Sequence, residues 1–410
     1  MFGKFLIKRK HKIIALCIIV ILGISFMVYH NYLSTVKYKE SFANIRLNIK
    51  YKKDIRVNNV EKIFIISNDD NIIYLSPAEK HFQISGFWFL KSNKSIFNRL
   101  DINNLALFPS GVVYRASHTS GGRIRFRTNS KKVKVKVELN KIDYHPHMPL
   151  TGTAGIDVYI GEGEKKVLID NFSPKHRFNK NYQGTISLNS NSVVQLTINL
   201  PLYSSIKKIE IGLENSSILR HPLPYSISKP IVFYGSSITQ GASASRPGTS
   251  YPAIVTRNLD ANLLNFGFSS SAKGELIMAK LIGSIDMSAF IMDYDHNAKS
   301  PIELRDTHYS FYKEIRKSQP DVPIIIISRI SAGYSVTLEE ATKRRKIIKD
   351  TYRKAISRND NNVYFIDGST LASHSDRDEL LVDGVHPNEL GMFLLANEIE
   401  QILHPILVSK

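Results

Sequence analysis

The sequence predicts an α/β protein with three parts: a membrane-spanning segment, an antiparallel β-sandwich and a three-layer α/β/α domain with a parallel sheet. Three observations support this prediction. An uncharged apolar run occupies residues 13–29, and short β-rich runs separated by turn residues fill residues 72–222. From residue 223 to residue 410, short apolar strands alternate with helix-length segments. Residues 1–12 are a basic tail, and residues 30–71 are expected to be a stalk or linker.

The apolar run at residues 13–29 is close to the lower limit of about 17 residues for a helix that crosses a bilayer. Lysine and arginine precede it, and positive flanks are retained on the cytoplasmic side. The sequence therefore predicts a single-pass protein of the cell membrane with a cytoplasmic N-terminus and an extracytoplasmic catalytic domain. A cleaved signal peptide is the alternative, but no small-x-small site follows the run. The single cysteine, Cys17, lies inside the run, so no internal disulfide is expected in the exported part.

The net charge of +19 attracts polyanions without specifying which. In residues 131–139, however, valine and leucine alternate with lysine and glutamate, a pattern typical of a strand with one buried and one solvated face. The lysines therefore fit a solvated sheet face, and no interleaved aromatic residues offer bases a stacking surface. We expect no nucleic-acid partner.

The segment after residue 223 contains the elements of a parallel sheet. Strands are expected at residues 231–234, 263–266, 289–292, 324–328 and 363–366. Helices are expected at residues 250–259, 275–282, 303–318, 339–356 and 388–403. This alternation predicts a sheet covered by helices on both faces, with ligands bound at the carboxyl ends of its strands.

Small hydroxyl residues follow the first of these strands. Gly235 permits a sharp backbone turn, and Ser237 then stands where a base from another loop can activate it. Asp383 and His386 precede the last helix at a spacing of three residues, so the carboxylate can accept from one ring nitrogen while the other faces the serine. A plain turn beside a surface histidine is the alternative, and the order and placement of both motifs favour the catalytic interpretation.

Two further loops should open onto the same sheet edge. Gly267 follows the second strand, and Asn297 follows the third. The Gly267 amide and the Asn297 side-chain amide could join the Ser237 amide in binding an oxyanion, although each residue could equally be structural. A buried Asp293 beside this loop would hold it by hydrogen bonds rather than take part in chemistry.

The four segments resemble the sequence blocks of the SGNH, or GDSL-type, hydrolases. The stretches GSSITQGASASRPGTSYPAI, NFGFSSSAKGE, DYDHNA and DGVHPN are similar to one subgroup of SGNH esterases, which also has an N-terminal β-domain with a Gly-x-Asp-Leu-Tyr signature. Residues 155–159, Gly-Ile-Asp-Val-Tyr, match that signature. The resemblance covers about residues 72–405 and implies a flavodoxin-like SGNH-hydrolase domain after a jelly-roll-like sandwich. Ser236 departs from the wider family, which usually has Asp there, but the subgroup also reads Gly-Ser-Ser.

The resemblance implies that Ser237 is the nucleophile, His386 the base, Asp383 its orienting acid, and Gly267 and Asn297 the oxyanion donors. The expected activity is that of a carboxylic ester hydrolase without a cofactor. We expect a membrane-anchored carbohydrate esterase that removes acetyl or other acyl groups through an acyl-enzyme. A lipid esterase or O-acyltransferase with the same triad, and a non-catalytic glycan-binding envelope protein, are the alternatives. The sequence does not indicate the oligomeric state.

Two other features have open roles. Arg246 lies just after the nucleophile loop and either contacts substrate or ties that loop down. His145 and His147 could form a metal pair, but no nearby cysteine or carboxylate cluster completes a site. No metal is therefore expected.

Overall fold

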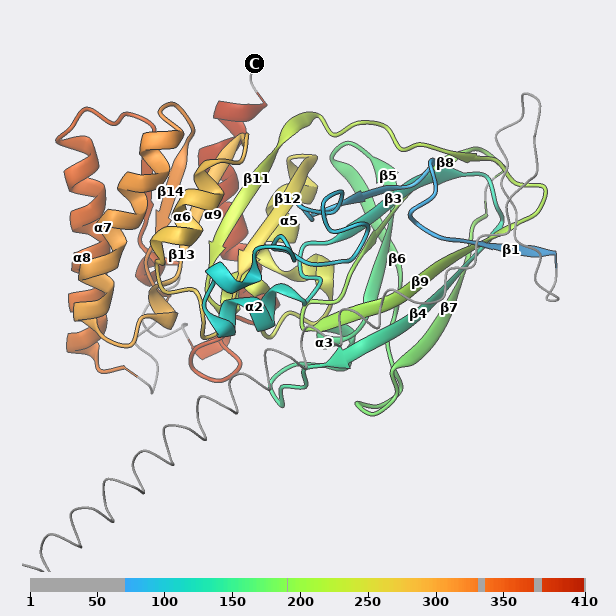
Figure 1. Cartoon of the computed structure of the whole chain (residues 1–410), viewed down its shortest axis with the longest axis horizontal. Coiled ribbons are helices and arrows are strands. Elements are labelled where there is room, and N and C mark those ends of the chain that lie inside the picture. The colour runs from blue at the N-terminus through green and yellow to red at the C-terminus, as the bar shows by residue number, and fades with distance from the viewer. Residues whose placement is uncertain (1–70, 190, 331–335, 372–377, 409–410) are drawn as a thin grey trace, which may run out of the picture. The chain divides into compact units, whose positions relative to one another are not determined.

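The computed structural model describes residues 71–189, 191–330, 336–371 and 378–408. These residues belong to one compact unit, in which a β-sandwich lies beside an α/β domain (Figure 1). None of the helices in the described ranges is long and apolar enough to cross a membrane. The expected membrane segment at residues 13–29, the basic tail and residues 30–70 of the expected stalk lie outside the described residues.

The α/β domain is built on a parallel sheet with the strand order β12-β11-β13-β14-β15. Its strands are β11 (Ile227–Gly235), β12 (Ala261–Gly267), β13 (Ala289–Asp293), β14 (Ile324–Ile327) and β15 (Val363–Ile366). In chain order this arrangement is 2-1-3-4-5, the order of flavodoxin-like sheets. The chain passes from β11 to β12 on one side and then crosses to β13 on the other side of β11. The carboxyl end of β11 is therefore the switch point at which such sheets bind ligands.

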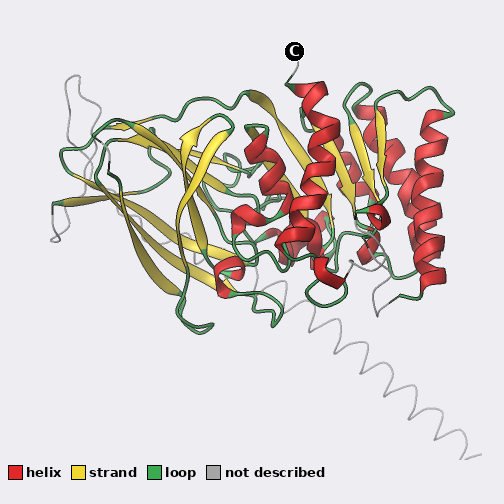
Figure 2. Cartoon of the chain, turned by 180° about the vertical axis from the view of Figure 1, so that it is seen from behind, coloured by secondary structure: helices red, strands yellow, loops and turns green. Residues whose placement is uncertain are grey.

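Helices cover both faces of this sheet (Figure 2). One face carries α5 (Tyr251–Asn258) and α9 (Glu389–Leu407), and the other carries α6 (Leu276–Gly283), α7 (Pro301–Ser318) and α8 (Leu338–Ile356). Successive side chains of β11 enter opposite cores, because strand side chains alternate between faces: Ile231 and Phe233 pack toward α5 and α9, and Val232 and Tyr234 toward α6 and α7. The structure confirms the predicted parallel sheet and its two helical layers.

The N-terminal strands form two antiparallel sheets, one in the order β1-β9-β4-β7 and the other in the order β10-β3-β8-β5-β6, with β2 paired to β3. The strands are β1 (Ile72–Leu75), β2 (Gln83–Ser85), β3 (Arg123–Thr128), β4 (Lys132–Ile142), β5 (Ile156–Glu162), β6 (Lys165–Phe172), β7 (Asn181–Ser187), β8 (Val194–Asn199), β9 (Ser204–Glu214) and β10 (Leu219–Arg220). Their inner faces enclose a core of isoleucine, valine, leucine and phenylalanine.

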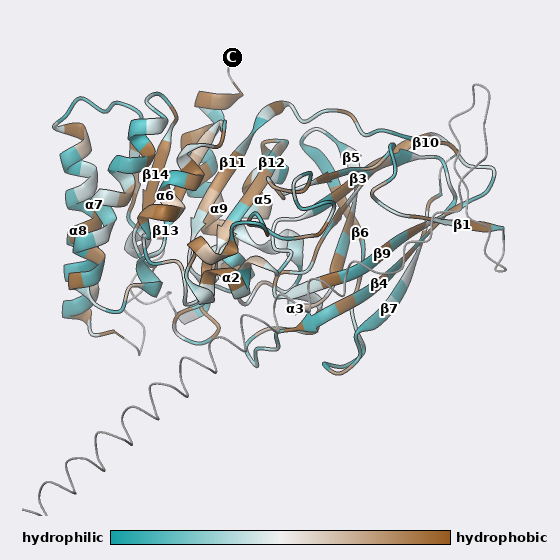
Figure 3. Ribbon diagram, in the orientation of Figure 1, coloured by the Kyte–Doolittle hydropathy of each residue, from teal (hydrophilic) through white to brown (hydrophobic). Residues whose placement is uncertain are grey.

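Strand β4 shows the expected alternation. Val133, Val135 and Val137 are at most 3% exposed, whereas the residues between them have solvent access. Figure 3 shows hydrophilic and hydrophobic colour mixed along β4, in contrast to the hydrophobic central strands of the α/β domain. The lysines of this strand therefore lie on a solvated sheet face, as predicted.

Helix α2 (Ser110–Ala116) departs from the expectation that residues 72–222 are β-rich throughout. Its Val112 and Ala116 are buried in the core of the α/β domain, together with Leu100 and Phe108. The segment before β3 therefore completes the core around the parallel sheet. The parallel sheet begins close to the expected boundary at residue 223, but some residues before that boundary also pack on the sheet.

Candidate active site

The segment after β11 places Ser237 at the switch point of the sheet. A side chain at Gly235 would collide with the Asp293 carbonyl and with Thr239, so only glycine fits this turn. Ser236 caps the short helix α4 (Ser237–Gln240), because its Oγ accepts from the Ile238 amide at 3.2 Å. Ser237 is the first residue of α4, where an amide has no acceptor within its own helix.

A chain of hydrogen bonds joins Ser237, His386 and Asp383. Ser237 Oγ lies 2.8 Å from His386 Nε2, and His386 Nδ1 lies 2.8 Å from Asp383 Oδ2. The other carboxylate oxygen, Oδ1, accepts from the amides of Val385 at 3.1 Å and His386 at 2.8 Å. Because the carboxylate holds the proton on Nδ1, Nε2 is left to accept the serine proton. The structure therefore brings the three residues together in the arrangement that their spacing predicted.

Hydrogen bonding keeps the Asp383 carboxyl ionised. Burial raises its pKa, but the bonds from the His386 amide and ring and the charge of His386 outweigh burial and hold the pKa below its ordinary value. An ionised carboxylate stabilises the imidazolium that forms when His386 takes a proton. The side chains of Asp383 and His386 are 35% and 15% exposed, whereas Ser237 is 9% exposed.

The Asn297 side chain lies in a 3-10 turn, η3 (Asp295–Asn297), after β13. Its Oδ1 accepts from the Ser270 amide at 3.0 Å, and its Nδ2 donates to the Phe268 carbonyl at 2.9 Å. A primary amide has two N–H donors, so one of them is left for another acceptor. This arrangement is compatible with the predicted oxyanion contact.

The Gly267 amide is already engaged. It donates to Asn265 Oδ1 at 2.8 Å, and a side chain at Gly267 would collide with the backbone of Gln240. The Gly267 carbonyl accepts from Arg99 Nη1 at 2.6 Å. The contacts show a glycine required for close packing against α4, and its predicted role as an oxyanion donor requires the bond to Asn265 to break.

Asp293 forms hydrogen bonds with the loop that carries Ser237 and with helix α5. It accepts from Thr239 Oγ1 at 3.2 Å and from the Tyr251 hydroxyl at 3.1 Å. Its carbonyl also accepts from the Ser236 amide at 3.0 Å. Burial raises the pKa of the Asp293 carboxyl to about 7, although both side-chain hydrogen bonds lower it. Asp293 therefore holds the loop by hydrogen bonds, as expected for a buried carboxyl at this position.

Asp295 fixes the turn that carries Asn297. Its carboxylate lies 3.1 Å from Arg329 Nε and 3.2 Å from Arg344 Nη1, and all three side chains are buried. Burial raises the pKa of Asp295, but the two arginines hold it below its ordinary value. The buried ion pairs therefore anchor η3 to the segment after β14 and to α8.

Arg246 binds the Gly-x-Asp-x-Tyr segment of β5. Its Nη1 lies 3.0 Å from Asp157 Oδ2 and 2.5 Å from the Tyr159 hydroxyl. Asp157 Oδ2 also accepts from the Gly248 amide at 2.7 Å. These contacts fit the second of the two expected roles, because they tie the loop after the nucleophile to the sandwich.

His147 joins the site from the sandwich and was not identified as a site residue by the sequence. Its ring stacks on the His386 ring, with centroids 4.6 Å apart and planes 6° apart. The sequence offered only the His145-x-His147 pattern, considered there as a metal pair. The position of His147 over His386 depends on tertiary packing and has no local sequence signal.

His147, Asp383 and His386 also form a cluster whose ligand atoms lie within 4.8 Å of one another, a spacing that could hold a metal ion. A metal binds in the plane of each imidazole that ligates it, and two parallel stacked rings have no such plane in common. Both nitrogens of His386 are also engaged by Ser237 and Asp383. The arrangement therefore favours a proton-transfer site over a metal site.

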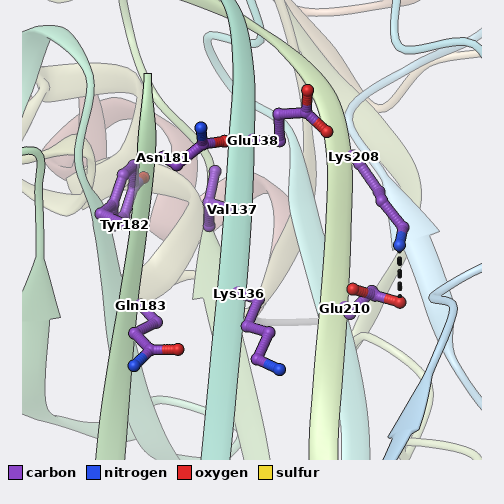
Figure 4. Close-up of a pocket in the computed structure, with 8 residues that line it drawn as sticks. All are labelled: Lys136, Val137, Glu138, Asn181, Tyr182, Gln183, Lys208 and Glu210. Carbon is purple, nitrogen blue, oxygen red and sulfur yellow. Dashed lines mark ion pairs between the residues drawn. The ribbon is translucent and has the colours of Figure 1, made fainter. Parts of the chain in front are cut away.

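A hollow of about 370 Å³ lies on the outer face of the sheet β9-β4-β7, as Figure 4 shows. It is lined by Lys136, Val137, Glu138, Asn181, Tyr182, Gln183, Lys208 and Glu210. Lys208 pairs with Glu210 at 2.9 Å. The lining contains no serine or histidine, so this hollow lacks the side chains that Ser237 and His386 provide elsewhere in the structure.

Two family models match the chain. Residues 228–404 match the GDSL-like lipase/acylhydrolase family, and residues 72–219 match the N-terminus of SGNH-hydrolase-type esterases. The curated proteins include no significant match to this sequence.

Solved structures show the same architecture. A protein from Bacteroides ovatus described as a GDSL-like lipase is 29% identical, with a TM-score of 0.72 over 82% of this chain and 98% of that one. A salicylyl-acyltransferase from a tetracycline biosynthetic pathway is 19% identical, with a TM-score of 0.67 over 81% and 97% of the two chains. An acetyl xylan esterase from the rumen bacterium Butyrivibrio proteoclasticus is 12% identical, with a TM-score of 0.51 over 82% and 99%. At their low identity, the last two show similarity of fold alone.

Proposed function

Because this chain belongs to the GDSL-like lipase/acylhydrolase, or SGNH, family of ester-bond hydrolases, we propose that it is a membrane-anchored, exported serine esterase that removes acetyl or other acyl groups from carbohydrate. The observation that carries the proposal is the hydrogen-bonded chain from Ser237 Oγ through His386 to Asp383. Such a chain is suited to activate a hydroxyl for attack on a carbonyl.

In the proposed reaction, Ser237 Oγ attacks the ester carbonyl while His386 Nε2 takes the hydroxyl proton. The oxyanion forms beside the Ser237 amide and the free donor of Asn297. His386 then gives its proton to the departing sugar oxygen. The sugar leaves as an alcohol, and the acyl group remains bound to Ser237. Water attacks this acyl-enzyme while His386 takes one of its protons. The bond between the acyl carbon and Ser237 Oγ then breaks, His386 returns the proton to Oγ, and the carboxylic acid leaves.

Accessibility of the site supports a bulky substrate. The side chains of Asp383 and His386 are partly exposed beside Ser237, which is itself 9% exposed, and such a site suits an acyl group that projects from a large glycan. The resemblance of the fold to an acetyl xylan esterase adds support for an acylated carbohydrate. The apolar run at residues 13–29 supports export and anchoring, with the catalytic domain on the extracytoplasmic side.

Acyl transfer is the second candidate, because the fold is also shared with a salicylyl-acyltransferase at a TM-score of 0.67. The two outcomes differ only in the molecule that attacks the acyl-enzyme. Product that forms only when an alcohol acceptor is added would favour transfer, and free acid formed in water alone would favour hydrolysis.

The test is release of acetate by the purified full-length chain, with Ser237→Ala beside the wild type. The substrates are p-nitrophenyl acetate and a panel of acetylated polysaccharides. We expect release by the wild type, loss of at least about 10³-fold in the variant as for other serine triads, and a preference within the panel that names the glycan. Equal release by a folded Ser237→Ala variant would contradict the proposal.

A further inference from the structure

We propose that His147 is a positioning residue for this reaction: its ring, supplied by the β-sandwich, holds His386 in the plane needed for proton transfer. The inference rests on the proposed function, since it assigns His386 the role of base. It adds a contribution from the N-terminal domain to a triad located entirely in the C-terminal one.

The geometry of His386 shows why a support is needed. Its bonds to Ser237 and Asp383 both lie at the ring edge, so they fix two atoms but leave the ring free to tilt about the line between them. His386 also lies in a partly exposed loop before α9. The parallel ring of His147 at 4.6 Å covers one face of His386 and opposes that tilt.

The loop that carries His147 is itself firmly held. Pro146 and Pro149 restrict the backbone on either side of it. Met148 is buried in a small apolar cluster with residues that precede β9 and residues that follow α4, namely Leu202, Tyr203, Ala242 and Ala244. At the start of the loop, Asp143 pairs with Arg115. The loop that carries His147 is therefore held by contacts with residues before β9 and with the segment after α4.

The charge of His147 matters because His386 becomes an imidazolium during the reaction. A neutral aromatic face next to a cation is favourable, whereas a second cation in the stack would repel it. Burial lowers the pKa of His147, the neighbouring His386 and His145 lower it further, and Asp383 raises it. These are the titratable groups that face the ring, and their balance favours the uncharged form.

The proposal is tested by separating the ring from its polar atoms. His147→Phe keeps a flat ring without charge, and His147→Gln keeps a hydrogen-bonding group without a ring. For a stacking role we expect kcat of His147→Phe within about 3-fold of wild type, and kcat of His147→Gln lower by about 10-fold or more with a smaller change in KM, because misplaced catalytic groups slow the chemical step.

Matched controls are His176→Phe and His176→Gln, since His176 is an exposed histidine on the loop between β6 and β7. Both should keep wild-type kcat. Thermal melting of every variant identifies a misfolded protein. Activity retained by His147→Gln but lost by His147→Phe would assign His147 to a hydrogen bond and overturn the proposal, as would wild-type activity in both.

His147→Lys isolates the effect of charge, because it lacks the ring as His147→Gln does but adds a cation. A neighbouring cation disfavours the imidazolium of His386. Compared with His147→Gln, we therefore expect His147→Lys to have a lower maximal kcat, and the acid limb of its pH–rate profile should lie at lower pH. NMR titration of the His386 ring protons in the same two variants gives a readout independent of activity: they should titrate at lower pH beside lysine. If the wild type hydrolyses nothing, the proposed function fails, and identical NMR titrations would separately overturn the role of His147.

Discussion

Two buried carboxyl groups beside the candidate active site carry different charges although only one residue separates them. Burial raises the pKa of Asp293 to about 7, since its neighbours are hydroxyl groups. Asp295 has two buried arginines beside it, and its pKa lies below the ordinary value. A change in pH near neutrality therefore acts on the loop under Ser237 and leaves the turn with Asn297 unchanged.

Replacement of Asp293 tests this difference. The folded protein holds a proton on Asp293 between pH 3.8 and about 7, where the unfolded chain has lost it. The stability gained from this proton is complete below pH 3.8 and is lost as pH rises toward 7, at up to about 1.4 kcal/mol per pH unit. Asp293→Asn keeps an acceptor for Thr239 and Tyr251 but cannot titrate, so this part of the pH dependence should disappear.

Urea unfolding of the wild type and Asp293→Asn at pH 5, 6 and 7 measures the effect. The difference in unfolding free energy should change steadily with pH in favour of the variant. A constant difference across this range would mean that Asp293 is already ionised at pH 5.

Two buried arginines from the N-terminal part of the chain bond to residues of the α/β domain. Arg123 in β3 donates to the Ala261 carbonyl at 3.1 Å and to Thr256 Oγ1 at 2.6 Å. Arg99, before α2, donates to the carbonyls of Asn265, Gly267 and Arg115. Burial lowers the pKa of Arg99 to about 9, and its role is to satisfy carbonyl oxygens at the end of β12.

Arg99→Met should be strongly destabilising because it keeps the length of the side chain but leaves buried carbonyls unpaired. Each such group costs about 1–3 kcal/mol, so we expect a loss of at least about 3 kcal/mol in unfolding free energy. Arg305→Met is the control, since Arg305 lies on the exposed surface of α7 and forms an ion pair with its neighbour Asp306. It should change stability by no more than about 0.5 kcal/mol. Equal unfolding free energies for the two variants would show that the carbonyls are satisfied in another way.

The elements differ in how far their sequences define them. The strands after residue 230 and the Asp383–His386 pair were predictable, because short apolar runs between helix-length segments and a three-residue spacing are local patterns. The packing of Val112 and Ala116 on the parallel sheet, and the stacking of His147 on His386, join segments far apart in the chain. The bond from the Gly267 amide to Asn265 depends on the orientation of the Asn265 side chain, which Ser120 and Thr239 also contact and which the motif does not specify.

At the scale of the molecule, the sandwich and the α/β domain belong to one compact unit. The core of the α/β domain includes Leu100, Phe108, Val112 and Ala116 from the N-terminal side. The sandwich in turn covers His386 with His147 and fastens the loop at Arg246. The candidate site therefore depends on both parts of the chain.

A fragment of residues 223–410 should fail to fold cooperatively, because it lacks four buried side chains of its core and the arginines that hold β12. Near-UV circular dichroism and thermal melting, beside the full-length chain, measure this. The fragment should have a weak near-UV signal and no sharp transition. A sharp transition at the full-length melting temperature would show that the catalytic domain is independent of the sandwich.

The most direct test of the central claim is covalent labelling of the full-length chain with a fluorophosphonate, followed by intact mass and peptide mapping. The account predicts one adduct on Ser237, its loss in Ser237→Ala, and its retention in the neighbouring variant Ser236→Ala. A folded wild type that takes no label, or an adduct on another residue, would contradict Ser237 as the nucleophile.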